Sequence, residues 1–169
     1  MPSPLPQEVN LVTGGTGLIG SHLIRRLRTE GRGVRALVRS GSNKDWLAEL
    51  NVELVVGDLR DAAEITRALE GVSHVFHCGG FVSDWGPRSE FHTTNVIGTR
   101  NIARAAATAD VQCLVHLSSA SVYGYPTVGR ISEQSPLCSH RIPYIQSKIQ
   151  AEQEIWDAVQ QSGLRATMI

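Results

Sequence analysis

Apolar segments of strand length alternate with segments of helical spacing along the whole chain. We predict six strands, over Val9–Thr13, Val34–Val38, Val52–Val56, His74–Cys78, Cys113–Leu117 and Ala166–Ile169. Between them we predict helices over Leu18–Thr29, Lys44–Leu50, Ala62–Leu69, Ser89–Ala109 and Tyr144–Gln161. Strands that alternate with helices are typical of parallel β-α-β units. Because such connections are right-handed, the pattern predicts an α/β fold with a doubly wound parallel sheet in the order 3-2-1-4-5-6.

Glycines at a characteristic spacing join the first predicted strand to the first predicted helix. The first of them suits a tight turn, the second the close approach of a phosphate, and the third close packing of helix on strand. Backbone N–H groups at a helix start lack partners within the helix and favour an anion. We therefore predict a Rossmann-type dinucleotide site; the alternative is a glycine-rich turn without a ligand. The candidate cofactor-binding residues of this segment are Gly14, Thr16, Gly17, Leu18, Ile19 and Gly20.

The end of the second predicted strand bears on which nicotinamide cofactor binds. An NAD-preferring site usually has an acidic residue there, about twenty residues past the glycines, to bind the ribose hydroxyls. This chain has Arg39 instead, and Ser40, Ser42 and Lys44 follow it. Since a guanidinium can hold a 2′-phosphate with two hydrogen bonds, the sequence favours NADP over NAD. In the alternative, Arg39 points into solvent and NAD binds through the adenosine pocket alone.

Residues after the third and fourth predicted strands extend this site. Asp58 lies where its carboxylate could accept a hydrogen bond from the adenine amino group. A carboxylate after a strand also commonly caps the next helix, a role that we predict for Asp61. The fourth strand ends in Cys78-Gly79-Gly80, where missing side chains would let the backbone approach a dinucleotide. An ordinary tight turn also explains these glycines.

A tyrosine and a lysine four residues apart begin the last predicted helix. Tyr144 and Lys148 project from one helical face, and an ammonium near a phenol favours its phenolate form. The pair could therefore transfer a proton beside a hydride carrier. The fifth strand leads into Ser118 and Ser119, where a hydroxyl can bind a substrate oxygen that changes between alcohol and carbonyl. In the alternative, Tyr144 is a half-buried aromatic residue and Lys148 is solvated.

Taken together, these motifs resemble those of the extended short-chain dehydrogenases/reductases, in the NAD-dependent epimerase/dehydratase group. The resemblance covers nearly every residue from Val9 to Ile169. The segment from Val34 to Arg39 with Trp85 also resembles the branch of dihydroflavonol reductases and 3β-hydroxysteroid dehydrogenases. The segments that carry the resemblance are Thr13–Gly20, Gly57-Asp58-Leu59, Asn95–Thr99, Ser118–Gly124 and Tyr144–Lys148.

The resemblance implies a role for each matching residue. Tyr144 would be the catalytic acid/base, and Lys148 would assist it while holding the nicotinamide ribose. Ser119, with Ser118 as the less favoured candidate, would orient the substrate oxygen. Asn95 would support a water-mediated proton relay; its alternative role is a local hydrogen bond within its helix. Leu59 and Asp58 would belong to the cofactor site.

Composition narrows the classes of partner. The formal net charge is zero and the basic residues are dispersed, so neither nucleic acid nor an anionic membrane is an expected partner. Neither a leader pattern nor a long apolar segment is found, which predicts a soluble, cytoplasmic protein. The three cysteines and six histidines show no spacing typical of a disulfide framework or a metal site. The length predicts one domain over residues 1–169.

We expect an NAD(P)-dependent oxidoreductase, epimerase or dehydratase that moves hydride between nicotinamide and a small molecule with a secondary alcohol or ketone. Members of the resembled family continue into a smaller substrate-binding domain, which we expect to be missing here. The alternative is therefore a cofactor-binding module or redox sensor without catalysis. A terminal strand with an exposed edge also predicts self-association, as in a homodimer.

Overall fold

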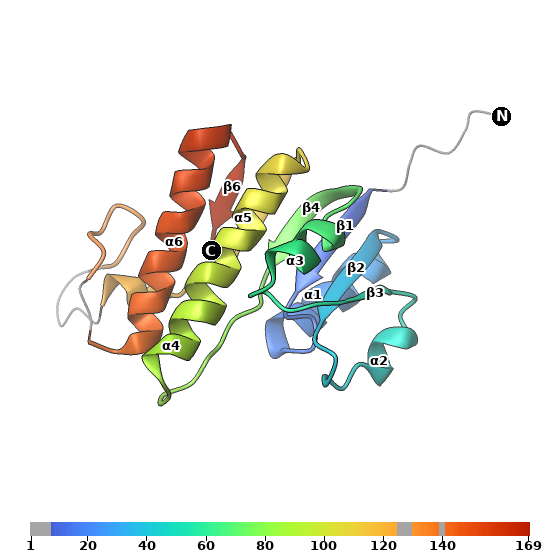
Figure 1. The fold of residues 1–169 in the computed structure, drawn as a ribbon, viewed down its shortest axis with the longest axis horizontal. Helices are drawn as coiled ribbons and strands as arrows, with labels where there is room; N and C mark the ends of the chain where they lie inside the picture. Colours follow the sequence, from blue (N-terminus) through green and yellow to red (C-terminus); the bar gives the residue numbers. More distant parts are fainter. Residues whose placement is uncertain (1–7, 125–129, 139–140) are drawn as a thin grey trace.

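The computed structural model describes residues 8–124, 130–138 and 141–169 (Figure 1). The segment Met1–Pro6, on which the expectation about a leader rests, lies outside them. Six α-helices are described: α1 (Leu18–Thr29), α2 (Asp45–Ala48), α3 (Ala62–Ala68), α4 (Arg88–Phe91), α5 (Gly98–Thr108) and α6 (Pro143–Ser162). The strands are β1 (Val9–Thr13), β2 (Gly33–Val38), β3 (Glu53–Val56), β4 (Val72–His77), β5 (Cys113–His116) and β6 (Ala166–Met168).

The six strands form one sheet in the order β3-β2-β1-β4-β5-β6, which confirms the predicted doubly wound fold. Every neighbouring pair is parallel. In the centre of the sheet, Leu11 of β1 is in register with Arg35 of β2 on one side and with Val75 of β4 on the other. The carboxyl ends of the strands therefore meet at one edge of the sheet, where ligands of this fold collect.

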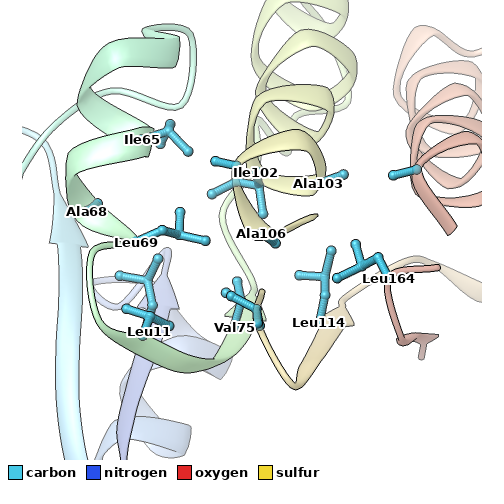
Figure 2. Packing of buried hydrophobic residues seen from close by; sticks show 14 of the residues in the cluster. Leu11, Ile65, Ala68, Leu69, Val75, Ile102, Ala103, Ala106, Leu114 and Leu164 are labelled. Carbon is cyan, nitrogen blue, oxygen red and sulfur yellow. The ribbon is translucent and has the colours of Figure 1, made fainter. Parts of the chain in front are cut away.

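Two hydrophobic clusters pack against opposite faces of the sheet. Because side chains alternate along a strand, Leu11 and Val12 of β1 enter different clusters. The Leu11 cluster joins β1, β4 and β5 to α3, α5 and α6, and Figure 2 shows Ile65 and Ile102 facing the strands in it. The Val12 cluster joins α1 and α2 to β1 and β2. Both β1 and α1 have the predicted bounds, since their apolar positions fill these clusters.

Two helical features differ from the prediction. The helix predicted over Ser89–Ala109 is not uniform, because a π-helical segment, η1 (His92–Ile97), lies between α4 and α5. A short 3-10 helix, η2 (Ala120–Tyr123), follows β5. The π-helical segment contains Asn95, and Ser119 is the N-cap residue that precedes η2. Among the described residues, no helix has both the length and the hydropathy required to cross a bilayer.

Candidate functional site

A cavity of about 620 Å³ lies above the carboxyl ends of β1 to β5. The glycine segment before α1 borders it on one side, and the ends of β2, β3 and β4 border the others. This position agrees with the rule that doubly wound sheets bind ligands where the strand order reverses, here between β1 and β4. The predicted cofactor residues that line the cavity are Gly14, Thr16, Gly17, Leu18, Ile19, Gly20, Arg39, Asp58, Leu59, Cys78, Gly79 and Gly80.

The glycine segment allows the start of α1 to come close to a ligand. Gly14 has a φ of 67°, and a Cβ added there would lie 2.7 Å from the Cα and N atoms of Gly79. The segment therefore lies directly against the end of β4. A Cβ added at Gly20 would lie 2.3 Å from the carbonyl oxygen of Gly14. Gly20 therefore allows α1 to pack closely against the glycine turn, whereas the sequence predicted close packing of the helix on the strand. The first turn of α1 has no acidic side chain, and Gly17 at its N-cap has no side chain, which leaves this helix start suited to an anion.

A buried histidine fixes the turn against β4. The Thr13 hydroxyl lies 2.7 Å from Nδ1 of His77 and accepts a hydrogen bond of 3.0 Å from the backbone N–H of Gly79. Nε2 of His77 lies 3.0 Å from the hydroxyl of Thr99 on α5. Burial lowers the pKa of His77 well below its usual range, and the nearby His116 and Lys148 lower it further. A neutral imidazole therefore joins β1, β4 and α5 beneath the cavity.

The adenosine end of the predicted site carries a pair of opposite charges. Two nitrogens of Arg60 donate to the Asp58 carboxylate, at 2.6 and 2.9 Å, and these bonds lower the pKa of Asp58. The charge of Arg39 contributes in the same direction, and the Arg39 side chain is exposed at the cavity. Asp61 accepts hydrogen bonds from the backbone N–H groups of Ala63 and Glu64, which confirms that it caps α3.

Lys44 does not line the cavity, although Arg39 does. It precedes α2 as the N-cap residue, and its backbone carbonyl accepts a hydrogen bond from Leu47. The sequence analysis in turn overlooked Arg60, which lines the cavity beside Asp58. The available signal was its position two residues after Asp58, at the carboxyl end of β3.

The predicted lysine lies at the other end of the site, below the end of β5. Lys148 is 6% exposed, and its ammonium donates a hydrogen bond of 2.7 Å to the carbonyl of Leu117, a residue that lines the cavity. Burial lowers the pKa of Lys148 to about 8, and the neighbouring Cys78 and Glu152 act against that fall. His116 beneath it is also buried, and burial together with the charge of Lys148 lowers its pKa to about 3. The alternative interpretation, in which Lys148 is solvated, is therefore wrong.

Tyr144 is half-buried in the first turn of α6, one turn before Lys148. Its side chain, that of Lys148 and that of Asn95 do not line the cavity. Gly80 connects the cavity with two of these three residues. A Cβ added at Gly80 would lie 3.1 Å from Oδ1 of Asn95 and 3.9 Å from Nζ of Lys148. Asn95 and Lys148 therefore lie next to the cavity, behind Gly80 and Leu117.

The two candidate serines have different partners. The Ser118 hydroxyl donates to Oε1 of the buried Glu152. The Ser119 hydroxyl lies 2.7 Å from that of Ser121, and Ser119 is the N-cap residue of η2. Ser118 is therefore held by the core of α6, whereas Ser119 has only a hydroxyl and a backbone N–H of its own turn as described partners. This difference agrees with the preference for Ser119 as the substrate-orienting residue.

Asn95 lies within the π-helical segment and is 2% exposed. Its amide nitrogen donates to the Phe81 carbonyl at 3.0 Å and to the Ser147 hydroxyl at 2.8 Å, and its oxygen accepts from the Phe81 N–H at 2.6 Å. These partners come from the segment after β4 and from α6, so the alternative of a local helix hydrogen bond is wrong. Asn95 connects the two borders of the site.

A doubly wound sheet with a glycine turn and a cavity at its switch point defines a dinucleotide-binding protein. The model of the NAD dependent epimerase/dehydratase family matches residues 10–169, and the chain belongs to that family. This result confirms the family that the sequence motifs indicated.

Relatives and solved structures agree with this membership. The chain is 43% identical over 124 residues to sterol demethylase protein B of Methylococcus capsulatus, covering 73% of this chain and 38% of the relative. It is 36% identical over 174 residues to 3 beta-hydroxysteroid dehydrogenase type 7 of Rattus norvegicus, covering 95% and 52%. A dTDP-glucose 4,6-dehydratase from Streptomyces venezuelae, solved with NAD, superposes with a TM-score of 0.87 at 31% identity, covering 95% of this chain and 54% of that one. The chain thus spans about half the length of the proteins it matches.

Proposed function

We propose that this chain forms the cofactor-binding half of an oxidoreductase, epimerase or dehydratase that acts on a secondary alcohol or ketone. The observation that carries the proposal is the connection between the two ends of the site. The cavity beside the glycine turn extends to Gly80 and Leu117, and Lys148 and Asn95 lie directly behind these residues. A dinucleotide in the cavity would place its reactive ring near proton-transferring side chains.

The residues of the cavity fit a nicotinamide dinucleotide. The glycines leave room where a Cβ would meet the backbone of β4, and the start of α1 suits a pyrophosphate. The bound cofactor would supply or accept hydride at its nicotinamide ring. In the direction of reduction, the Tyr144 hydroxyl would give its proton to the substrate oxygen while Ser119 donates a hydrogen bond to it. Lys148 would hold a ribose hydroxyl, and its ammonium would favour the phenolate that the proton transfer leaves on Tyr144.

The decisive test of catalysis is Tyr144→Phe, assayed through nicotinamide absorbance with a panel of secondary alcohols and ketones. We expect turnover to fall about a hundredfold or more, because the variant cannot transfer the proton. Cofactor affinity, measured by fluorescence, should stay unchanged since the phenyl ring fills the same space. Full activity in the variant would contradict the role of Tyr144.

We also propose that NADP is the preferred cofactor, because Arg39 places an exposed guanidinium at the cavity where an NAD-preferring site carries a carboxylate. Arg39→Ala should weaken NADPH binding about tenfold or more and leave NADH binding unchanged. The matched control is Arg26→Ala, which removes a similarly exposed charge near the far end of α1. An equal loss for both cofactors would contradict the proposed phosphate contact.

The alternative function is cofactor binding without turnover. It is favoured by the absence of Ser119 and Tyr144 from the described residues that line the cavity. In that case wild type and Tyr144→Phe would bind NADPH equally and neither would turn over any member of the substrate panel.

A further inference from the structure

Glu152 is a buried carboxylate that the proposed chemistry does not use. It lies on α6, one turn after Lys148 and two turns after Tyr144, and it is 7% exposed. Residues spaced by four share one face of a helix. A buried charge is costly unless a partner compensates for it, so its neighbours indicate what the carboxylate does.

Glu152 and Lys148 hold two consecutive residues at the end of β5. The Lys148 ammonium donates to the Leu117 carbonyl, and the Ser118 hydroxyl donates to the Glu152 carboxylate. The next residue is Ser119, which carries the candidate substrate-orienting hydroxyl. Two neighbouring turns of α6 therefore fix the segment that presents this hydroxyl to the site.

Two neighbours of Lys148, Cys78 and Glu152, oppose the effect of burial on its pKa. The titratable groups that act on it or on its neighbours are His77 and Cys78 at the end of β4, His116 on β5 and Glu152 on α6. Burial lowers the pKa of both histidines and raises the pKa of the Cys78 thiol, so these three groups are neutral near neutral pH. Among these groups, Glu152 is the only carboxylate.

We propose that Glu152 is a positioning residue of this site, which keeps Lys148 protonated at neutral pH and holds the Leu117–Ser119 segment in place. The inference rests on the proposed function, because Lys148, the residue on which Glu152 would act, contacts the cofactor only in that function. The electrostatic interaction between Glu152 and Lys148 would exist in the free protein. It can therefore be tested without any cofactor or substrate.

The test is an NMR titration of side-chain carbons in the chain labelled with ¹³C-lysine. The sequence contains two lysines, Lys44 and Lys148, so two signals are followed and Lys44→Arg assigns them. In Glu152→Gln the amide oxygen can still accept from Ser118, but the charge is gone. We expect the midpoint of Lys148 to fall by about one pH unit, because an opposite charge nearby favours the ammonium form.

Glu154→Gln is the matched control, since it removes one negative charge from the same helix, at a residue paired with Arg100 on α5. Its Lys148 midpoint should equal that of wild type. Equal midpoints in Glu152→Gln and Glu154→Gln would overturn the inference, even if Glu152→Gln lowers the melting temperature, because a purely structural role changes stability without moving the lysine titration.

A wild-type measurement covers the case in which Glu152→Gln does not fold. With ¹³C-labelled glutamate, the Glu152 carboxyl signal should shift at the midpoint of Lys148, whereas the Glu154 signal should not. An unmoved Glu152 signal would overturn the inference. Failure to bind NADPH would instead contradict the proposed function and leave the lysine result standing.

Discussion

Gly14 offers the sharpest test of how this chain forms its site. Replacement by alanine has two separate consequences in the structure. The backbone has a φ of 67°, which an L-residue adopts at a cost of about 1–2 kcal/mol. The added Cβ would also lie 2.7–2.8 Å from the backbone of Gly79 and Cys78, whose atoms cannot rotate away. Overpacking of this kind costs about 1–3 kcal/mol more.

The chain contains a control that separates these two consequences. Gly31 has a φ of 72°, but a Cβ added there meets nothing within 4 Å. Gly31→Ala therefore carries the backbone penalty without the clash. We expect Gly14→Ala to lose about 2 kcal/mol more unfolding free energy than Gly31→Ala.

Urea unfolding measures this difference, and NADPH fluorescence titration measures its consequence for the site. In Gly14→Ala the turn must separate from the end of β4, so affinity for NADPH should collapse, whereas Gly31→Ala should bind like wild type. Equal destabilisation and equal affinity in the two variants would refute the close approach of turn and strand as the basis of the site.

Three further predictions concern the groups around the site. Because the folded-state pKa of Lys148 is about 8, below its ordinary 10.5, the unfolded chain binds more protons above pH 8, and stability should rise with pH there. Wild type should gain about 2 kcal/mol relative to Lys148→Met between about pH 7 and about pH 9.5 in urea unfolding; a constant difference would contradict a lowered pKa. Asp61→Ala should cost about 1 kcal/mol through loss of the α3 cap while NADPH affinity persists, and an unchanged unfolding curve would count against the cap. Asn95→Ala should weaken NADPH binding and increase hydrogen exchange at the backbone amide of Phe81, whose N–H donates a hydrogen bond to the Asn95 side-chain oxygen in wild type; unchanged exchange would contradict that role.

Local patterns explain why much of the fold could be predicted. The bounds of β1 and α1 follow from the apolar spacing that ends in Leu27 and from the glycines between the two elements. The strand order followed from the alternation of strands and helices together with right-handed connections. Asp61 could be identified as a cap because its partners lie two and three residues away.

The features that the sequence analysis missed depend on contacts between distant segments. The π-helical segment has no clear local signal at Asn95, whose partners Phe81 and Ser147 lie 14 and 52 residues away. The contact of Ser118 with Glu152 spans 34 residues. One signal was present for Glu152, because it occupies an apolar helical face next to Ala151 and a turn before Ile155, where an unpaired carboxylate would be costly.

The most direct test of the account is a titration of the purified wild-type chain with NADPH and with NADH, followed by tryptophan quenching and nicotinamide fluorescence. We predict saturable binding of one dinucleotide per chain, tighter for NADPH than for NADH, because the glycine turn suits a pyrophosphate and Arg39 lines the same cavity. Binding of neither dinucleotide by a folded chain would contradict the central claim that this sheet edge is a nicotinamide cofactor site.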